Sequence, residues 1–443
     1  MATETATHAL CPECLARLPA VKAARGAEVW LERTCPRHGA IKTKIAKDAG
    51  RFFDASSSSA KPRPFTPLTQ YAGECGRDCG WCGQHRQHIC TGVVEITGAC
   101  NLDCPVCYFG GKSGAHISLG EFSARLDDLL AIEQGRLDVL QLSGGECLLH
   151  PRFSEILDLA LARDVGRVVL NTNGLALLDD NALFEKIRRH RDRVEAYLQF
   201  DGFDAAACAA LRGRSLLAEK RKILEKLNAA EIKICLAVTV CAQNLAEVPE
   251  ILRFATGLTH VSGVTFQRLT RVGHARGAAP VSVLQEDILL ALASSGLLAY
   301  KDLQPLPCSH ENCTTLAFLF CTPEKTWSVA DYVDLRKCRD VLANRLAFDQ
   351  AVLEYMRKNI CDCFAARLLG DQPALRKLRE FAEGNASAHN GMKVLRVIVK
   401  NFMDPETFDF ARVRKCCAGV AVGNRRVVPF CLHNVLKMEG EMR

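Results

Sequence analysis

Between residues 91 and about 300 the chain alternates short apolar runs with longer amphipathic stretches. The apolar runs are rich in β-branched residues and most end in polar ones, a pattern typical of buried strands that are each followed by a helix. It predicts six strands, in segments 91–97, 137–142, 165–174, 194–202, 232–240 and 262–268. Such alternation favours an α/β fold, and polar residues at the strand ends favour a partial (β/α)6 TIM-like barrel whose mouth is the active site.

The loop after the first predicted strand carries Cys100, Cys104 and Cys107. Three thiolates in one loop can hold three corners of a cubane 4Fe-4S cluster and leave the fourth iron open for chemistry. The second strand runs into a Gly-Gly-Glu sequence at residues 144–146. Gly144 and Gly145 let the backbone approach a ligand closely, and Glu146 brings a carboxylate suited to an ammonium group.

The composition indicates a globular protein. With 443 residues, 48% of them hydrophobic, the chain can bury a large core in two or three domains. It has no apolar run of eighteen residues, and its first residues lack the pattern of a secretion signal, so we expect a cytoplasmic protein. In that compartment the 23 cysteines are better explained as metal ligands and reduced thiols than as disulfides. The net charge of +7 is modest, so no nucleic acid is expected, while peripheral contact with anionic lipid is compatible with it.

Residues 1–54 are predicted to form an N-terminal metal-knuckle module, of the rubredoxin or zinc-knuckle kind. Cys11 and Cys14 form a C-x2-C knuckle, and Cys35 and His38 form a C-x2-H pair about twenty residues later. This spacing is typical of a small site for a single zinc or iron ion. The fourth ligand is either His38 or a later cysteine, and the alternative is three reduced cysteines without metal.

Residues 55–92 are expected to comprise a serine- and proline-rich linker and a cysteine-rich loop. Four thiols within sixteen residues favour a second, auxiliary 4Fe-4S cluster, although one of them could instead complete the N-terminal site; they are Cys75, Cys79, Cys82 and Cys90. The nearby His85 and His88 are expected to orient ligands or to bond the backbone rather than to bind iron.

Residues 93–300 form the predicted barrel, and residues 301–443 a C-terminal auxiliary-cluster domain. Distant cysteine pairs in turn-rich settings are expected to meet at one cluster, with Cys417 as an alternative to Cys416; the chosen four are Cys308, Cys313, Cys416 and Cys431. Further thiols could be ligands or buried residues, namely Cys321, Cys338, Cys361 and Cys363. Inside the barrel, Cys208, Cys235 and Cys241 are expected to be ordinary core residues.

The order of strand, cysteine loop, helix, strand and Gly-Gly-Glu resembles the radical S-adenosylmethionine superfamily. That resemblance implies that Cys100, Cys104 and Cys107 ligate a catalytic 4Fe-4S cluster. S-adenosylmethionine would close the fourth site, with Glu146 near its amino group, and its cleavage would yield a 5'-deoxyadenosyl radical that removes hydrogen from an unactivated carbon. Asn173 and Asp201, at strand ends, would position adenosine or the substrate, with Gln267 and Arg268 as weaker candidates.

Several further motifs resemble the tetraether-lipid-synthase-like branch of that superfamily: Cys-Pro-x-His-Gly near the N-terminus, Leu-Gln-Phe-Asp-Gly at 198–202, Cys-Ser-His-x-x-Cys at 308–313 and Pro-Phe-Cys at 429–431. The branch implies one or two auxiliary clusters in a SPASM-like domain, an electron donor such as a ferredoxin or flavodoxin, and an anaerobic setting. It also implies a lipid or other hydrophobic substrate and carbon–carbon coupling of alkyl chains. The alternatives are modification of a peptide or small metabolite and, from another class, a non-catalytic iron–sulfur electron carrier.

One residue departs from the pattern of the superfamily. The position after Gly-Gly-Glu is usually proline, and in this chain it is Cys147. The substitution is expected to loosen the turn rather than to place a thiol near the cofactor.

Overall fold

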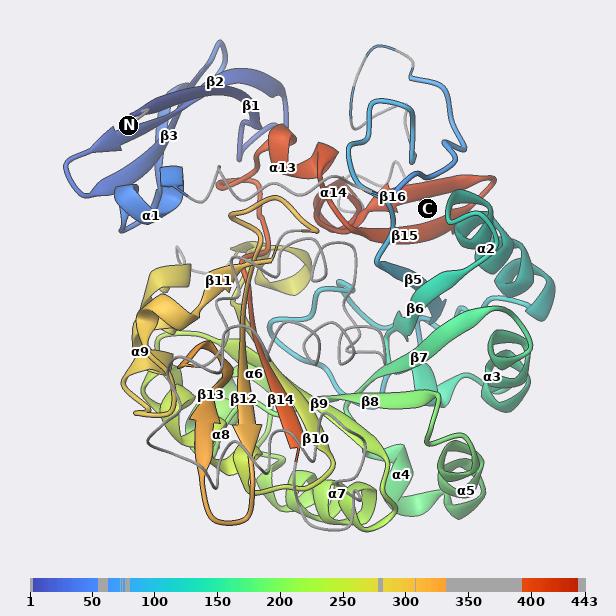
Figure 1. Cartoon of the computed structure of the whole chain (residues 1–443). Coiled ribbons are helices and arrows are strands. Elements are labelled where there is room, and N and C mark those ends of the chain that lie inside the picture. The colour runs from blue at the N-terminus through green and yellow to red at the C-terminus, as the bar shows by residue number, and fades with distance from the viewer. Residues whose placement is uncertain are drawn as a thin grey trace, which may run out of the picture.

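Two β-sheets organise the chain, whose computed structural model describes residues 3–54, 63–71, 73, 75, 80–277, 282–306, 308–331 and 393–436. The N-terminal residues form a four-stranded sheet in the order β1-β2-β3-β4, and the rest contributes to one sheet of twelve strands (Figure 1). Four of the cysteines considered above lie outside the described residues: Cys79, Cys338, Cys361 and Cys363.

The six strands predicted for the barrel are present and lie side by side in chain order. All five neighbouring pairs among them are parallel, so their carboxyl ends meet at one rim and the polar residues after each strand gather there. The strands are β5 (Thr91–Thr97), β6 (Leu137–Gly144), β7 (Val165–Thr172), β8 (Val194–Gln199), β9 (Lys233–Val240) and β10 (Val261–Arg268). The predicted α/β barrel is confirmed.

Helices follow the barrel strands and cover the outside of the curved sheet (Figure 1). In α2 (Leu119–Ile132) the buried side chains of Phe122, Leu126 and Leu129 recur at helical spacing, and Ser118 caps the first turn. The other helices of the barrel are α3 (Phe153–Leu161), α4 (Ala176–Asp179), α5 (Asn181–Arg189), α6 (Ala205–Arg212), α7 (Leu217–Ala229), α8 (Val248–Thr256) and α9 (Gln285–Ala293). Short 3-10 turns lie at Cys147–Leu149, Leu245–Glu247, Gly273–Gly277, Tyr300–Asp302 and Val329–Asp331.

Strands from the predicted C-terminal domain extend the barrel sheet at both edges. Beyond β10, the parallel strand β14 (Lys393–Lys400) pairs with β12 (Thr314–Cys321), which also pairs with β11 (Gln304–Pro305) and β13 (Thr326–Ser328). Beyond β5 lies the hairpin of β15 (Ala418–Gly423) and β16 (Arg426–Pro429). The described strands of the C-terminal third are therefore part of the barrel sheet, and the short helices α13 (Phe410–Arg414) and α14 (Phe430–Leu436) lie near the rim (Figure 1).

The N-terminal sheet is antiparallel and has a very small core. Its strands are β1 (Glu4–Leu10), β2 (Arg17–Arg25), β3 (Glu28–Cys35) and β4 (Gly39–Ala46), followed by α1 (Ala49–Asp54). One buried cluster of this sheet contains only Ala9, Ala20 and Leu31, with Ile45 packed against it. A buried ion pair of 2.9 Å between Lys22 and Asp409 joins the sheet to the segment before α13. So few apolar contacts are typical of a module that a metal ion stabilises.

Candidate active site and metal centres

The Gly-Gly-Glu sequence packs directly against the start of the cysteine loop. The amides of Gly145 and Glu146 donate to the carbonyls of Thr97 and Ala99 at 2.8 and 2.7 Å. A Cβ at Gly144 would lie 2.2 Å from the Thr97 oxygen, and a Cβ at Gly145 would lie 2.3 Å from the Ala99 oxygen. In the structure the two glycines therefore admit the backbone of the cysteine loop itself, whereas the sequence predicted their approach to a ligand.

The three cysteines of this loop are partly exposed at the carboxyl rim of the sheet. Burial raises the pKa of Cys100 to about 11, with a further contribution from the Glu146 carboxylate. Among the described residues, the groups whose ligand atoms all lie within 4.8 Å of one another do not include these cysteines. Three thiols in one loop could hold three irons of a cubane cluster and leave the fourth iron open.

Glu146 is fixed by the ends of β6 and β7. Its buried carboxylate accepts from Thr172 Oγ1 at 2.6 Å, from the amide of Asn173 at 2.7 Å and from that of Leu148 at 3.2 Å. Burial raises its pKa, and these donors oppose that shift. The Asn173 side chain donates to Asn101 in the cysteine loop at 2.7 Å. Glu146 and Asn173 thus position the loop. The contact of these two residues with S-adenosylmethionine stays a prediction.

Two cationic side chains beside the cysteine loop were not found from the sequence. Arg212, at the end of α6, forms a bidentate pair with Asp201 at 2.7 and 2.8 Å and reaches the thiol of Cys104, whose pKa burial raises and Arg212 lowers. Lys220 of α7 is buried and donates to the carbonyl of Asn173, and burial lowers its pKa to about 8. A single arginine or lysine in an amphipathic helix has no motif that distinguishes it from a surface residue.

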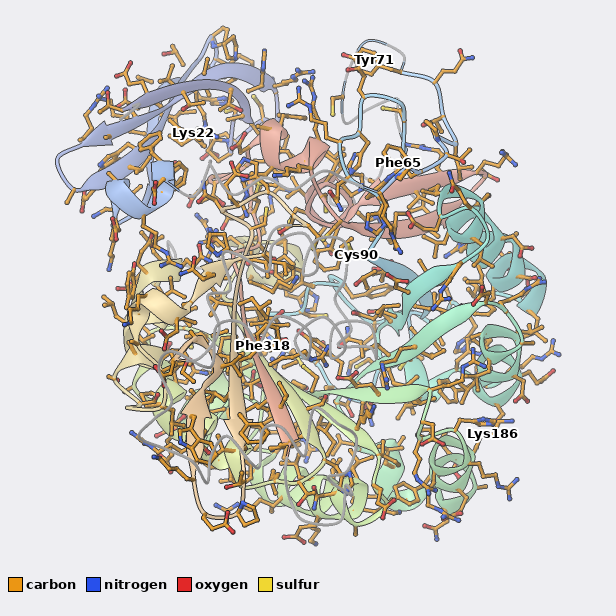
Figure 2. The ribbon with its side chains drawn as sticks, viewed as in Figure 1. Lys22, Phe65, Tyr71, Cys90, Lys186 and Phe318 are labelled. Carbon is orange, nitrogen blue, oxygen red and sulfur yellow. The ribbon has the colours of Figure 1, made fainter. Side chains whose placement is uncertain are left out.

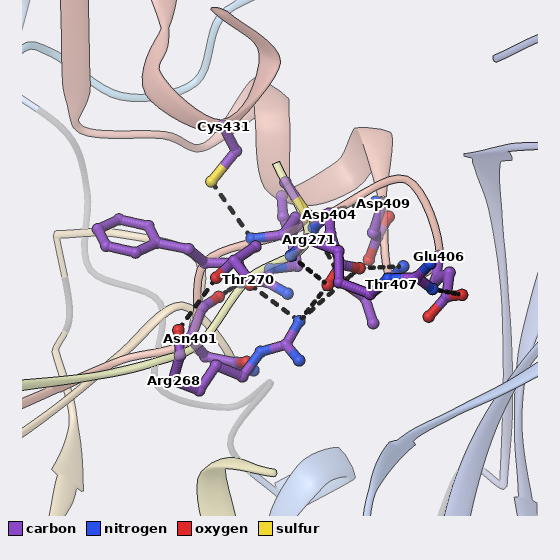
Figure 3. A network of polar contacts seen from close by, with 12 residues as sticks. Arg268, Thr270, Arg271, Asn401, Asp404, Glu406, Thr407, Asp409 and Cys431 are labelled. Carbon is purple, nitrogen blue, oxygen red and sulfur yellow. Dashed lines mark hydrogen bonds and ion pairs between the residues drawn. The ribbon is translucent and has the colours of Figure 1, made fainter. Parts of the chain in front are cut away.

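Arg268, a weaker candidate for positioning adenosine or the substrate, makes its described contacts within the protein. Its guanidinium holds the segment after β14, because it bonds the Phe402 carbonyl at 3.1 Å, Thr407 at 3.0 Å and Asp404 at 3.4 Å (Figure 3). Gln267 has a long contact of 3.4 Å with Thr239. Arg268 therefore has a structural role in this ion pair. The single contact of Gln267 is longer than most of those that Arg268 makes.

The N-terminal module brings four ligand atoms together between its strands. Sγ of Cys14 and Cys35 are 3.9 Å apart, and Nδ1 of His38 lies 3.4 Å from the Cys11 sulfur and 3.5 Å from that of Cys35. A tetrahedral zinc ion would place two sulfurs about 3.8 Å apart and a sulfur about 3.5 Å from a nitrogen. Backbone amides and His38 lower the pKa of Cys35 to about 6, against an opposing effect of burial. The residues fit one metal ion, with His38 as the fourth ligand.

A second group joins thiols that the sequence assigned to different clusters. Cys90, Cys308 and Cys417 are buried, and their sulfurs lie within 4.8 Å of one another. The pairing of β5 with β15 explains this, since the Cys90 amide donates to the Cys417 carbonyl at 2.9 Å. The structure therefore groups Cys90 with Cys308, and it places beside Cys308 the Cys417 thiol that the sequence offered as the alternative to Cys416. Cys90 lies at the start of β5, close to the C-terminal hairpin (Figure 2).

A third group lies between α13 and α14. Arg412 Nε donates to the sulfur of Cys313 at 3.1 Å, and burial raises the pKa of Cys416 and of Cys431 to about 12, with the neighbouring thiols adding to it. Cys75 and Cys82 belong to the buried cluster that packs against Cys431. Other thiols are buried in the structure, as predicted for those inside the barrel: Cys147, Cys208, Cys235, Cys241 and Cys321.

Two family models match the chain. Residues 4–47 match the HMPTM N-terminal zinc ribbon domain, in agreement with the four-ligand group of the N-terminal sheet. Residues 94–255 match the Radical SAM superfamily, and this range contains the cysteine loop and Gly-Gly-Glu. Among the described residues no helix is long and apolar enough to cross a membrane.

The chain is similar over nearly its full length to 7,8-dihydro-6-hydroxymethylpterin dimethyltransferase of Methanocaldococcus jannaschii. The identity is 26% over 492 aligned positions, which cover 98% of this chain and 94% of the relative. The chain is also 31% identical to mycofactocin maturase MftC of Mycobacterium tuberculosis over 181 residues, which cover 40% of this chain and 43% of the relative. Among solved structures, SuiB of Streptococcus suis bound to its precursor peptide SuiA has a TM-score of 0.41 at 14% identity, over 47% of this chain and 46% of SuiB.

Proposed function

We propose that this radical S-adenosylmethionine enzyme methylates a carbon of a reduced pterin or of a closely related nitrogen heterocycle. The chain is an enzyme of that class, because the superfamily model spans the cysteine loop and Gly-Gly-Glu and the parallel barrel places both at one rim. The observation that carries the choice of substrate is the pterin dimethyltransferase, which matches the N-terminal module, the barrel and the C-terminal strands together. The mycofactocin maturase matches only part of the chain.

The residues of the loop and its surroundings fit a 4Fe-4S cluster. Cys100, Cys104 and Cys107 would hold it, and when bound it supplies electrons to S-adenosylmethionine. Arg212 and Lys220 place positive charge beside Cys104 and Glu146, which suits the carboxylate of S-adenosylmethionine. Glu146 and Asn173 hold the loop against β7, so that the reacting atoms meet in a fixed geometry.

The proposed exchange balances with two electrons for each methyl group. One S-adenosylmethionine, reduced by one electron, would supply methionine and a 5'-deoxyadenosyl group that takes a carbon-bound hydrogen from the substrate and leaves as 5'-deoxyadenosine. A second S-adenosylmethionine would supply the methyl group, and with a second electron it would leave as S-adenosylhomocysteine. Both electrons come from a reduced donor of the ferredoxin or flavodoxin class.

The other cysteine groups are proposed to be metal centres that support this chemistry. Cys11, Cys14, Cys35 and His38 would hold one zinc or iron ion in the N-terminal module. Cys90, Cys308 and Cys417 would hold a second centre. Cys313, Cys416 and Cys431, with a thiol of the Cys75–Cys82 loop, would hold an auxiliary 4Fe-4S cluster that passes electrons to the barrel.

The test is an anaerobic incubation of the reduced protein with 7,8-dihydro-6-hydroxymethylpterin and S-adenosylmethionine that carries a 13C-methyl group. The expected product is a pterin whose mass rises by one or two labelled methyl groups, together with 5'-deoxyadenosine and S-adenosylhomocysteine. Formation of 5'-deoxyadenosine with an unchanged pterin would contradict the substrate and leave the enzyme class intact. The Cys104→Ala variant is the control for non-enzymatic methylation.

The second candidate function is the coupling of lipid alkyl chains, which the resemblance to the tetraether-lipid-synthase-like branch implies and which stays a prediction. The motifs at Cys308 and at Pro429–Cys431 support it, and they lie in the part of the chain that also matches the pterin enzyme. The two candidates differ in what the radical attacks, so lipid extracts added to the same incubation separate them. New carbon–carbon bonds between alkyl chains, without methylated pterin, would favour the lipid candidate.

A further inference from the structure

Residues 404–409, which lie between β14 and α13, are fastened to the N-terminal module. Arg33 of β3 is buried, and its guanidinium donates to the carbonyls of Glu406 and Leu10, each at 2.8 Å. Leu10 directly precedes Cys11 of the knuckle. One guanidinium therefore joins the four-ligand group of the module to residues 404–409, the bracing segment.

The same segment also holds the turn after β10. Arg271 forms an ion pair with Glu406, and its amide lies 3.5 Å from the Asp404 carboxylate. That carboxylate also pairs with Arg268, at the end of β10, at 3.4 Å (Figure 3). Two acidic side chains of the bracing segment therefore hold two arginines on either side of Thr270.

The turn after β10 contacts the catalytic cysteine loop. The amide of His274 donates to the Cys107 carbonyl at 3.0 Å, and its ring Nδ1 lies 3.1 Å from the Cys104 carbonyl. A Cβ at Gly273 would lie 2.1 Å from the Cys107 oxygen, so the two backbones are in close contact. The carbonyls of two of the three cysteines are thus held by one residue of this turn.

Buried charges make up the junction between the module and the barrel. The five residues that carry them are each 5% exposed or less, and they are Lys22, Arg33, Arg268, Asp404 and Asp409. Removal of one partner from a buried ion pair leaves an uncompensated charge, which is costly. Such pairs favour one arrangement of the joined parts, so the position of the module is coupled to that of the turn after β10.

We propose that Arg271 and His274 are positioning residues for the catalytic loop, and that the metal-loaded knuckle keeps them in place through the bracing segment. The N-terminal module then has a role in the reaction although its ligands lie outside the barrel, because it favours the arrangement of the cysteine loop that binds S-adenosylmethionine. This inference rests on the metal proposed for the knuckle and on S-adenosylmethionine binding at the loop, and it is independent of the pterin substrate.

The experiment compares the cluster-loaded full chain with Arg271→Gln, Glu406→Gln and the double variant under anaerobic conditions. This ion pair is less buried than the other two of the junction, so each single variant leaves no deeply buried charge without a partner. Binding of S-adenosylmethionine is measured by equilibrium dialysis without reductant, so that it is not cleaved. Hydrogen–deuterium exchange is followed in peptides that cover residues 101–111 and 269–277.

Each single variant is expected to weaken binding of S-adenosylmethionine about fivefold, at the small end of coupling between two sites, and to speed exchange in both peptides. The double variant should bind no more weakly than either single variant, because the two residues act through one contact. At saturating S-adenosylmethionine the cleavage rate should stay within about twofold of the parent, since the change affects binding.

Three further variants separate the module from the rest of the junction. Cys35→Ser, which should release the knuckle metal, is expected to produce the same change in binding and exchange. His274→Ala should weaken binding likewise while the knuckle metal stays. Lys47→Gln is the matched control, because Lys47 joins the module to Asp287 of α9 at 2.7 Å and not to the bracing segment; it should change neither binding nor exchange.

Unchanged binding and exchange in both Arg271→Gln and Glu406→Gln would overturn the proposal. A Cys35→Ser protein that has lost the knuckle metal and binds S-adenosylmethionine as the parent does would also overturn it, because the module would then not act on the loop. A parent protein that carries the cluster and binds no S-adenosylmethionine contradicts the proposed function itself, and this inference with it, so the failures are distinguishable.

Discussion

Two cysteine groups, the N-terminal knuckle and the loop at residues 100–107, differ in the number of ligand atoms they offer and in how closely those atoms lie. In the knuckle, four ligand atoms from Cys11, Cys14, Cys35 and His38 lie within 4.8 Å of one another and close around one point. The loop offers three thiols, more widely spaced, at the rim of the barrel. Closed sites are typical of structural metals, and sites with an open position are typical of catalytic ones.

The two groups also differ in the size of the sheet that carries them. The knuckle lies in a small antiparallel sheet with few apolar contacts, so a metal ion bound there would contribute to its stability. The loop packs against the parallel sheet at Gly144 and Gly145, and the charged side chains of Arg212, Lys220 and Glu146 lie beside it. A stable scaffold would let the loop hold a cluster with an open corner without a fourth protein ligand.

The largest effect is expected for Cys104→Ala. Removal of one of three ligands should leave no stable catalytic cluster, so 5'-deoxyadenosine formation from S-adenosylmethionine should fall to background in an anaerobic assay. The metal of the N-terminal knuckle should remain, as measured by iron and zinc analysis. Equal loss of activity in Cys35→Ser would remove the distinction between the two sites.

A large effect is expected for Gly145→Ala. The added Cβ would lie 2.3 Å from the carbonyl oxygen of Ala99 and must displace the cysteine loop. A displacement of about 1 Å in a catalytic site can cost about 100-fold in rate, so a loss of that size in 5'-deoxyadenosine formation is expected. Gly114→Ala, in the same loop but with nothing within 4 Å of the added Cβ, should retain activity.

A moderate effect, on stability rather than on cleavage, is expected for Cys35→Ser. Loss of a thiolate from the four-ligand group should release one metal ion per chain and lower the melting temperature of the N-terminal sheet. Calorimetry with metal analysis measures both. Cleavage of S-adenosylmethionine should change by less than about tenfold, or about 1.4 kcal/mol in activation free energy.

The smallest effect is expected for Cys147→Ala. The Cys147 thiol is buried and donates to the carbonyl of Asn171 at 3.4 Å, while the loop contacts are made by the neighbouring Glu146. Its loss should lower the free energy of unfolding by about 1 kcal/mol, the usual size for a small core truncation. Steady-state formation of 5'-deoxyadenosine should stay near that of the parent, and a large loss would place the thiol at the cofactor instead.

The barrel could be predicted from the sequence because its information is local. Each strand such as 232–240 has its own apolar pattern, and parallel strands joined by helices take their neighbours in chain order. The cysteine loop and the knuckle were likewise predicted, since their ligands are close in sequence. His38 could be named as a candidate for the same reason.

The remaining features depend on contacts between distant parts of the chain. The pairing of Thr91 with Ala418, which brings Cys90 to Cys417, has no signal in either segment alone. The extension of the barrel by β14 has the same origin. Arg212 looks like any arginine at the end of a helix until Asp201 and Cys104 are seen beside it.

The central claim is that the loop at Cys100, Cys104 and Cys107 holds an open-cornered cluster that S-adenosylmethionine closes. Pulsed EPR of the reduced protein with S-adenosylmethionine carrying 15N in its amino group tests this most directly. The predicted result is a 15N coupling to the cluster that is absent in Cys104→Ala and present in Cys35→Ser. A reduced cluster without 15N coupling, in the presence of saturating S-adenosylmethionine, would contradict the claim.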